Sequence, residues 1–121
     1  MPHPDNWPRT QHPVVSPWSF VHVDDIEPVV VGPGCLRRAL PSTPDVRVWV
    51  VDMAPGSRWP SVDVHDTGEA VLVVSGELIE GEQRLGPGSY LFFSPTSQHQ
   101  PRTEIGVRLF GINPVASSVG R

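Results

Sequence analysis

DVHDTGEAVLVVSGELI, residues 63–79, holds both the strongest β signal of the chain and its densest group of potential metal ligands. Within it, Ala70–Val74 is a run of apolar residues, most of them β-branched, which favours a strand. We expect this strand to cover residues 70–79, with a break at Gly76. Because both faces of the run are apolar, it reads as a buried strand.

Three side chains just before this strand are suited to bind a cation. Asp63 and His65 are two positions apart, so on an extended chain they point to one face. Glu69 returns to that face after a small turn at Thr67-Gly68 and stands at the mouth of the buried strand. A carboxylate there is costly unless it is paired or bound to a cation. His99 comes from a distant strand, and closing a barrel brings it across from the other three. Imidazole and carboxylate together are ligands for Fe(II), Mn(II), Ni(II) or Zn(II).

The rest of the chain alternates short β runs with turns. Fifteen prolines and eleven glycines separate these runs, and no segment shows a sustained helical period. We therefore expect little helix and an all-β antiparallel barrel or double-sheet sandwich. The other expected strands are Phe20–Val23, Pro28–Val31, Cys35–Leu40, Arg47–Met53, Val62–His65, Gln83–Leu85, Tyr90–Phe93, His99–Thr103 and Val107–Ile112.

The first eighteen residues differ from the remainder. Residues 1–18 are rich in proline and predict an extended arm, whereas residues 19–121 predict a single barrel domain. Trp7 and Trp18 favour an arm anchored against the barrel or against a partner subunit. We expect a homodimer.

Charge and composition exclude several partners. A net charge of −4 gives no reason to expect nucleic-acid binding. The pair Arg37-Arg38 reads as a solvated strand edge. No apolar run is long enough to span a membrane, and the single cysteine, Cys35, reads as a small buried residue. We expect a cytoplasmic protein without membrane contact.

Two motifs carry a resemblance to a known family. Gly56, the triplet Asp63-Val64-His65, Glu69 and Gly76 resemble the first cupin motif. The turn Gly86-Pro87-Gly88, the strand 89–93, Pro95 and His99 resemble the second. Residues 56–113 are most similar to the ChrR-type cupins, which include the metal-binding domain of certain anti-sigma factors and related dioxygenases. The resemblance implies a small cupin-type antiparallel β-barrel, also called a double-stranded β-helix or jelly roll.

The resemblance also implies a metal centre. Carried over residue by residue, the ligands are His65, Glu69 and His99, around one divalent ion of Fe, Zn, Mn or Ni, with Fe or Zn favoured. Asp63 stands where the family has its first histidine. It is then a fourth ligand or a catalytic general base near the substrate, or it hydrogen-bonds a metal-bound water, or it points away.

Three functions follow. The first is a metal-dependent enzyme that acts on a small carbonyl or enolate substrate as an oxygenase, lyase or isomerase, with a dioxygenase as one form. The second is a non-catalytic module that binds a metal or a small molecule. A third, weaker one is a structural partner without a ligand. Anti-sigma activity is disfavoured, because the segment before Ser19 is short and proline-rich for a helical zinc domain.

For several apolar side chains, the sequence is compatible with a place in the core and with a place in a pocket wall. Trp49, Val51 and Met53 alternate with Val48 and Val50, and either set can face the interior. We expect core positions for Phe92, Phe93 and Phe110, with a pocket wall as the alternative. Trp59 is a candidate lid over the mouth of the barrel.

Overall fold

The described part of the chain contains ten strands and one short helical turn. Its structure, a computed structural model, describes residues 18–64 and 67–115. After the 3₁₀ turn η2 (Val23–Asp25), the strands are β1 (Val29–Gly32), β2 (Cys35–Leu40), β3 (Val46–Met53), β4 (Asp63–Val64), β5 (Glu69–Gly76), β6 (Leu78–Glu80), β7 (Gln83–Leu85), β8 (Tyr90–Phe93), β9 (Gln98–His99) and β10 (Val107–Pro114). The expected all-β architecture is confirmed. The described part of the chain has no helix of the length and apolarity that a membrane span requires.

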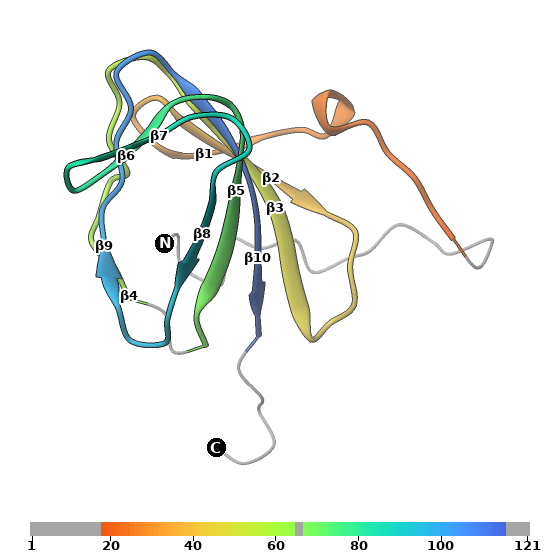
Figure 1. Cartoon of the computed structure of the whole chain (residues 1–121). Coiled ribbons are helices and arrows are strands. Elements are labelled where there is room, and N and C mark those ends of the chain that lie inside the picture. Colours follow the sequence, from red (N-terminus) through yellow and green to blue (C-terminus); the bar gives the residue numbers. More distant parts are fainter. Residues whose placement is uncertain (1–17, 65–66, 116–121) are drawn as a thin grey trace.

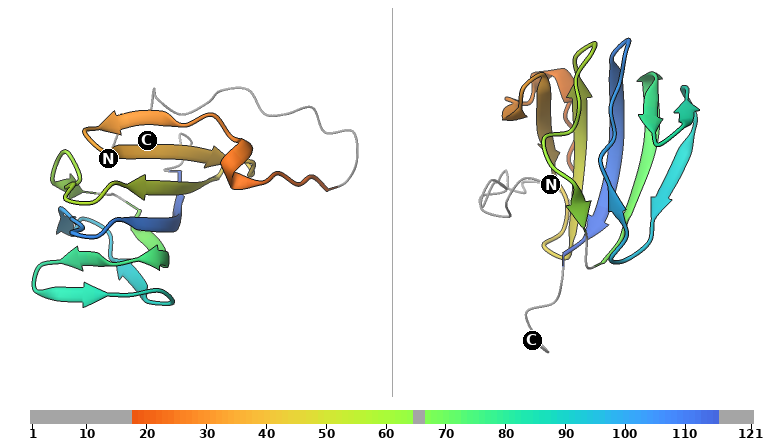
Figure 2. Two further views of the ribbon diagram at one scale, coloured as in Figure 1. Left: turned by 90° about the horizontal axis from the view of Figure 1, so that it is seen from above. Right: turned by 90° about the vertical axis from the view of Figure 1, so that its left-hand side faces the viewer.

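The strands form one long sheet and two short ladders (Figure 1). The long sheet has the order β1-β2-β3-β10-β5-β8, and every pairing in it is antiparallel. The ladders are β4-β9 and β6-β7. Arg102, which lies between β9 and β10, forms isolated backbone β-bridges with Arg58 and with Ile79 of β6. Figure 2 shows that β1 and the β6–β7 hairpin lie at opposite ends of the strand array.

One expected strand is absent. Phe20–Val23 was predicted as β, whereas residues 18–22 are irregular and lead into the turn η2. His22 caps this turn, because its Nδ1 accepts a hydrogen bond from the backbone N–H of Asp24 at 3.1 Å. Local capping by a polar side chain therefore outweighs the β preference of Phe20 and Val21.

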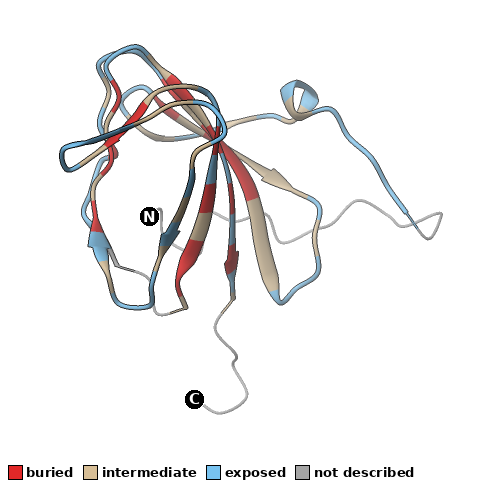
Figure 3. Cartoon of the chain, viewed as in Figure 1, coloured by how far each residue is buried: buried red, intermediate tan, exposed pale blue. Residues whose placement is uncertain are grey.

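The core lies between the long sheet and the ladders. Buried residues gather on the middle strands β3, β5 and β10 (Figure 3). On β5, Val71 and Val73 are buried, but Leu72 and Val74 are 40% and 47% exposed. The expectation of a strand buried on both faces is therefore wrong: β5 has one inner and one outer face.

The outer face of β10, β5 and β8 is apolar. Phe110 pairs with Leu72, which pairs in turn with Tyr90, so these three side chains form one row across the sheet. Phe92 is 61% exposed and Phe110 is 36% exposed. The core position expected for these two phenylalanines is wrong, because the register places them outside while Phe93 and Leu109 face inward.

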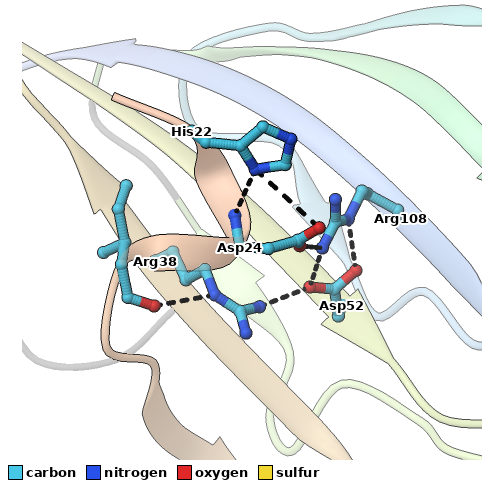
Figure 4. Close-up of polar contacts among 6 residues, drawn as sticks. His22, Asp24, Arg38, Asp52 and Arg108 are labelled. Atoms are coloured by element: carbon cyan, nitrogen blue, oxygen red, sulfur yellow. Dashed lines mark hydrogen bonds and ion pairs between the residues drawn. The ribbon is translucent and has the colours of Figure 1, made fainter. Parts of the chain in front are cut away.

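An ion-pair network ties η2 to the long sheet (Figure 4). Asp52 on β3 accepts hydrogen bonds from Arg38 on β2 and Arg108 on β10, both at 2.7 Å. Arg108 also donates to Asp24 at 2.7 Å. Arg38 further donates to the carbonyl of Ile26 at 2.9 Å. The two carboxylates raise the pKa of Arg108, chiefly through the hydrogen bonds that Arg108 donates to Asp52. This network fixes the segment before β1 against three strands.

Candidate metal centre and cavity

A cavity of about 30 Å³ lies inside the fold, and both layers contribute to its wall. Three of its residues carry polar or charged groups, namely Arg37, Glu69 and His99. The others are mostly apolar: Trp49, Val51, Met53, Trp59, Val71, Leu78, Phe93, Pro101 and Leu109. The cavity lining also shows which side of β3 faces inward: the inner set is Trp49, Val51 and Met53.

Glu69 reaches the cavity from the first position of β5. The residue before it, Gly68, has φ +83°, and a Cβ there would lie 3.0 Å from the carbonyl oxygen of Phe93. Only glycine adopts this conformation at low cost. The chain turns here, and Glu69 pairs with Phe93 on β8. The Glu69 side chain is 5% exposed, as expected for a carboxylate at the mouth of the inner face.

His99 reaches the same cavity from β9. Its ring stacks on Phe93, with centroids 3.7 Å apart and planes inclined by 10°. Its Nε2 lies 3.9 Å from Oε1 of Glu69, and its Nδ1 lies 3.8 Å from Oε1 of Glu80. The imidazole is 4% exposed and thus stands between two carboxylates in a largely apolar wall.

The structure brings together two of the four predicted site residues. Glu69 and His99 meet at the cavity, whereas His65 lies outside the described residues. Asp63 is described through its backbone, which pairs directly opposite His99 in the β4-β9 ladder. Among residues 18–64 and 67–115, no three His, Cys, Asp or Glu side chains form a metal-binding group. The complete ligand set therefore stays a prediction.

Glu69 and His99 fit a divalent cation. Metal–nitrogen and metal–oxygen bonds to such ions are about 2.0–2.2 Å, so two donors on one ion lie at most about 4.4 Å apart. The 3.9 Å between Nε2 of His99 and Oε1 of Glu69 falls within this limit and beyond direct hydrogen-bond length. A cation between these groups would also offset the cost of burying the carboxylate.

Trp49, one of the cavity residues, is closely packed against β10. Trp49 lies over Gly111, its pairing partner on β10: a Cβ added to Gly111 would come within 2.0 Å of Cζ2 of the indole. The indole Nε1 of Trp49 donates to Oδ1 of Asn113 at 3.0 Å. The ring is therefore held flat against β10 by a buried hydrogen bond and by the absence of a side chain below it.

Arg37 is the cavity residue that differs most from expectation. The interpretation of Arg37-Arg38 as a solvated strand edge is wrong, because β2 lies inside the sheet order and Arg37 is 3% exposed. Its neighbour Cys35 on the same face is fully buried, as expected. Burial lowers the pKa of Arg37, and the charge of Arg47 lowers it further. Arg38, on the opposite face, belongs to the Asp52 network.

Trp59 and Glu80 also belong to the site. Trp59, a candidate lid from the sequence, lines the cavity wall. Its backbone N–H donates to the carbonyl of Pro101, and its backbone carbonyl accepts from the side-chain amide of Gln100, both at 2.9 Å. Burial raises the pKa of Glu80. Glu80 was not singled out from the sequence. The pattern that could have indicated it is an acidic residue directly after the apolar pair Leu78-Ile79 and before a turn at Gly81.

Comparison with known proteins supports the fold. The family profile of the ChrR cupin-like domain matches residues 18–113. An RmlC-like cupin from Shewanella frigidimarina superposes with a TM-score of 0.70 at 20% identity, over 83% of this chain and 93% of that chain. A search of curated proteins finds no match.

Two further solved structures are similar. The Rhodobacter sphaeroides complex of SigE with the anti-sigma ChrR matches with a TM-score of 0.69 at 19% identity, over 76% of this chain and 51% of the matched chain. The polyketide cyclase RemF from Streptomyces resistomycificus matches with a TM-score of 0.68 at 21% identity, over 80% of this chain and 79% of that chain. At these identities the likeness shows a shared fold.

Proposed function

The chain belongs to the ChrR cupin-like domain family, and we propose that it is a small metal-dependent enzyme acting on a carbonyl or enolate compound. In this proposal His65, Glu69 and His99 hold one divalent cation, with iron or zinc favoured. The observation that carries it is the approach of two buried groups, Nε2 of His99 and Oε1 of Glu69, to 3.9 Å at an apolar cavity.

In this proposal the cation and the side chains of the cavity have different roles. A bound divalent cation supplies Lewis acidity toward a carbonyl or enolate oxygen, or toward dioxygen. The chain's own residues bind and orient the substrate. Phe93 fixes the plane of the His99 ring by stacking. The wall of Trp49, Val51 and Leu109 excludes bulk water, which strengthens electrostatic interactions inside.

Asp63 has two candidate roles in this proposal, an oxygen ligand of the cation or a general base. Its backbone pairs with that of His99 in the β4-β9 ladder. The position at which this chain has aspartate in place of the first histidine of the cupin motif is therefore next to a proposed ligand. An oxygen ligand and a general base are both compatible with an aspartate there. The two roles differ in outcome: Asp63→Asn lowers metal affinity if Asp63 is a ligand, and lowers turnover with unchanged metal content if it is a base.

The second candidate function is a binding module without turnover. The similarity to a structure containing the anti-sigma ChrR favours it, just as the similarity to the cyclase RemF favours an enzyme. Fold alone does not choose between these. The deciding experiment supplies Fe(II)- and Zn(II)-loaded protein with a panel of β-dicarbonyls and hydroxyketones and follows dioxygen uptake and products by NMR. Turnover that is lost in Glu69→Ala supports the enzyme. Saturable binding without any product supports the module.

We also propose a homodimer. The apolar outer face of β10, β5 and β8 supports an interface, because exposed apolar patches of this kind mark contact sites. Its exposed members are Leu72, Val74, Tyr90, Phe92, Phe110 and Ile112. Light scattering of the wild type and of Phe92→Asp gives the mass directly: a dimer that becomes a monomer supports the face, and a monomeric wild type contradicts it.

A further inference from the structure

We propose that the cavity recognises its substrate through a carboxylate, with Arg37 as the binding residue. The substrate class is then a small organic acid whose carbonyl or enolate group faces Glu69 and His99. This inference rests on the proposed function for the role of the carbonyl end, and it adds the residue that binds the other end.

The first observation is the position of Arg37 in the sheet. Arg37 pairs with Val51, which pairs with Leu109, which pairs with Val73 on β5, the strand that carries Glu69. Adjacent strands are about 4.8 Å apart, so three steps separate β2 from β5 by about 14 Å along the sheet. The curved sheet still brings both residues to one cavity. The cavity thus has a cationic flank, an apolar middle, and a flank with a carboxylate and an imidazole.

The second observation is the chemistry of the cationic flank. Arg37 is 3% exposed, and a guanidinium binds carboxylates through two parallel N–H donors. Lysine is absent from the chain, so arginine supplies every basic side chain apart from histidine. Of the nine arginines, Arg37 is the one that lines this cavity within the described residues.

A second donor is available in the same wall. The indole Nε1 of Trp59 is buried and has no hydrogen-bond acceptor within the described part of the chain. Trp59 is 5% exposed and lines the cavity. Buried indole N–H groups normally find a partner. An oxygen atom of the bound ligand would provide one, and a carboxylate has a second oxygen to offer after binding Arg37.

The size of the cavity limits the carbon skeleton. A cavity of about 30 Å³ exceeds the roughly 10–15 Å³ that one ordered water needs, yet it admits only a few water-sized groups. The apolar middle of Val51, Met53 and Leu109 suits a short aliphatic chain. We therefore expect the smallest oxo acids, of about two or three carbons, to bind best.

Matched pairs of ligands test the proposal without relying on turnover. Acetate, pyruvate and acetoacetate are each compared by titration calorimetry with acetamide, pyruvamide and acetoacetamide, which have the same shape without the charge. We expect at least one acid to bind the wild type tenfold or more tightly than its amide. Equal affinities for every pair, or no binding of any of the three acids at millimolar concentration, would overturn the proposal.

Variants assign the preference to Arg37. Arg37→Gln should remove the preference for the acid and leave amide binding within about twofold, whereas Arg37→Lys should retain part of it. Trp59→Phe should weaken acid binding by a smaller factor. Arg38→Gln is the matched control, since Arg38 faces the Asp52 network outside, and it should bind as the wild type does. An acid preference that survives in Arg37→Gln contradicts the proposal.

The metal content of the same samples separates this inference from the proposed function. If the wild type holds no metal but prefers acids through Arg37, the metal-dependent function fails and the carboxylate site stands. If the wild type holds metal and shows no acid preference, the reverse is true.

Discussion

Nδ1 of His99 lies 3.8 Å from Oε1 of Glu80, on the side of the imidazole opposite Glu69. The two ring nitrogens therefore face different carboxylates. A carboxylate that accepts a hydrogen bond from the second nitrogen of a metal-binding histidine fixes the orientation of the ring and raises its basicity. At 3.8 Å, Glu80 is beyond hydrogen-bond length, and we expect the two groups to approach when a cation binds. Glu80 faces this nitrogen, although it comes from the β6-β7 ladder and not from a strand that carries a proposed ligand.

This relationship predicts that Glu80 supports metal binding indirectly. Glu80→Ala should weaken Zn(II) affinity by about 10–100-fold without abolishing it, the range usual for residues behind a ligand. Competition with a chromogenic chelator measures the affinity. Glu82→Ala, which removes an exposed acid from the adjacent turn, should leave it unchanged. Equal affinities for wild type and Glu80→Ala would show that Glu80 does not act on His99.

The contact between Trp49 and Gly111 predicts a stability effect. Gly111→Ala would place a Cβ 2.0 Å from the Trp49 ring, which is buried and hydrogen-bonded to Asn113 and so cannot move freely. Overpacking of this kind costs about 1–3 kcal/mol. Urea unfolding should report a loss of that size. Gly86→Ala is the control, since nothing lies within 4 Å of its added Cβ. Equal midpoints for the two variants would contradict the packing described for β10.

The ion pair between Arg108 and Asp24 predicts a pH dependence. Arg108, by hydrogen bond and by charge, holds the pKa of Asp24 below its usual value of 3.8. A carboxyl with a depressed pKa stabilises the folded state fully above the unfolded pKa, and loses this contribution as the pH falls through the folded pKa.

Asp24→Asn should therefore lower the urea midpoint slightly at pH 7, and the difference from wild type should shrink as the pH falls below 3.8. Because Asp24 is exposed, salt should also reduce it. Asp25→Asn, a substitution of the neighbouring exposed acid, is the comparison. A difference that stays constant from pH 7 to pH 3 would rule out the ion pair as its cause.

Much of the fold follows from the sequence because turns and β runs alternate so regularly. The bounds of Cys35–Leu40, Gln83–Leu85 and Tyr90–Phe93 are confirmed as predicted. Glycine or proline lies within two residues of both ends of each of these strands, so local turn chemistry indicates where they begin and end. The two motifs also predicted that Glu69 and His99 would lie close together, and both line the cavity. Their role as metal ligands stays a prediction.

The inward and outward faces were harder to predict. In Phe92-Phe93 both residues are equally apolar, and only pairing with Ala70 and Glu69 decides which one faces the cavity. Period-two alternation gives two choices for each strand, and the register selects one.

Arg37 was misread for the same reason. On β2, Leu36 and Leu40 share the outer face with Arg38, whereas the inner face carries Cys35, Arg37 and Ala39. By hydropathy alone the leucines would be placed inside. The arginine is buried because a cavity, and not a packed core, lies next to this part of the strand. A functional cavity is where rules of local pattern are expected to fail.

The central claim is that Glu69 and His99 bind one divalent cation together, and its most direct test is the metal content of the purified protein. Wild type prepared without chelator and reconstituted with Fe(II) or Zn(II) is compared by mass spectrometry with Glu69→Ala, His99→Ala and the exposed-histidine control His22→Ala. We predict one cation per chain in the wild type and the control, and little in the two site variants, with unchanged circular dichroism. Equal metal content in all four proteins would contradict the account.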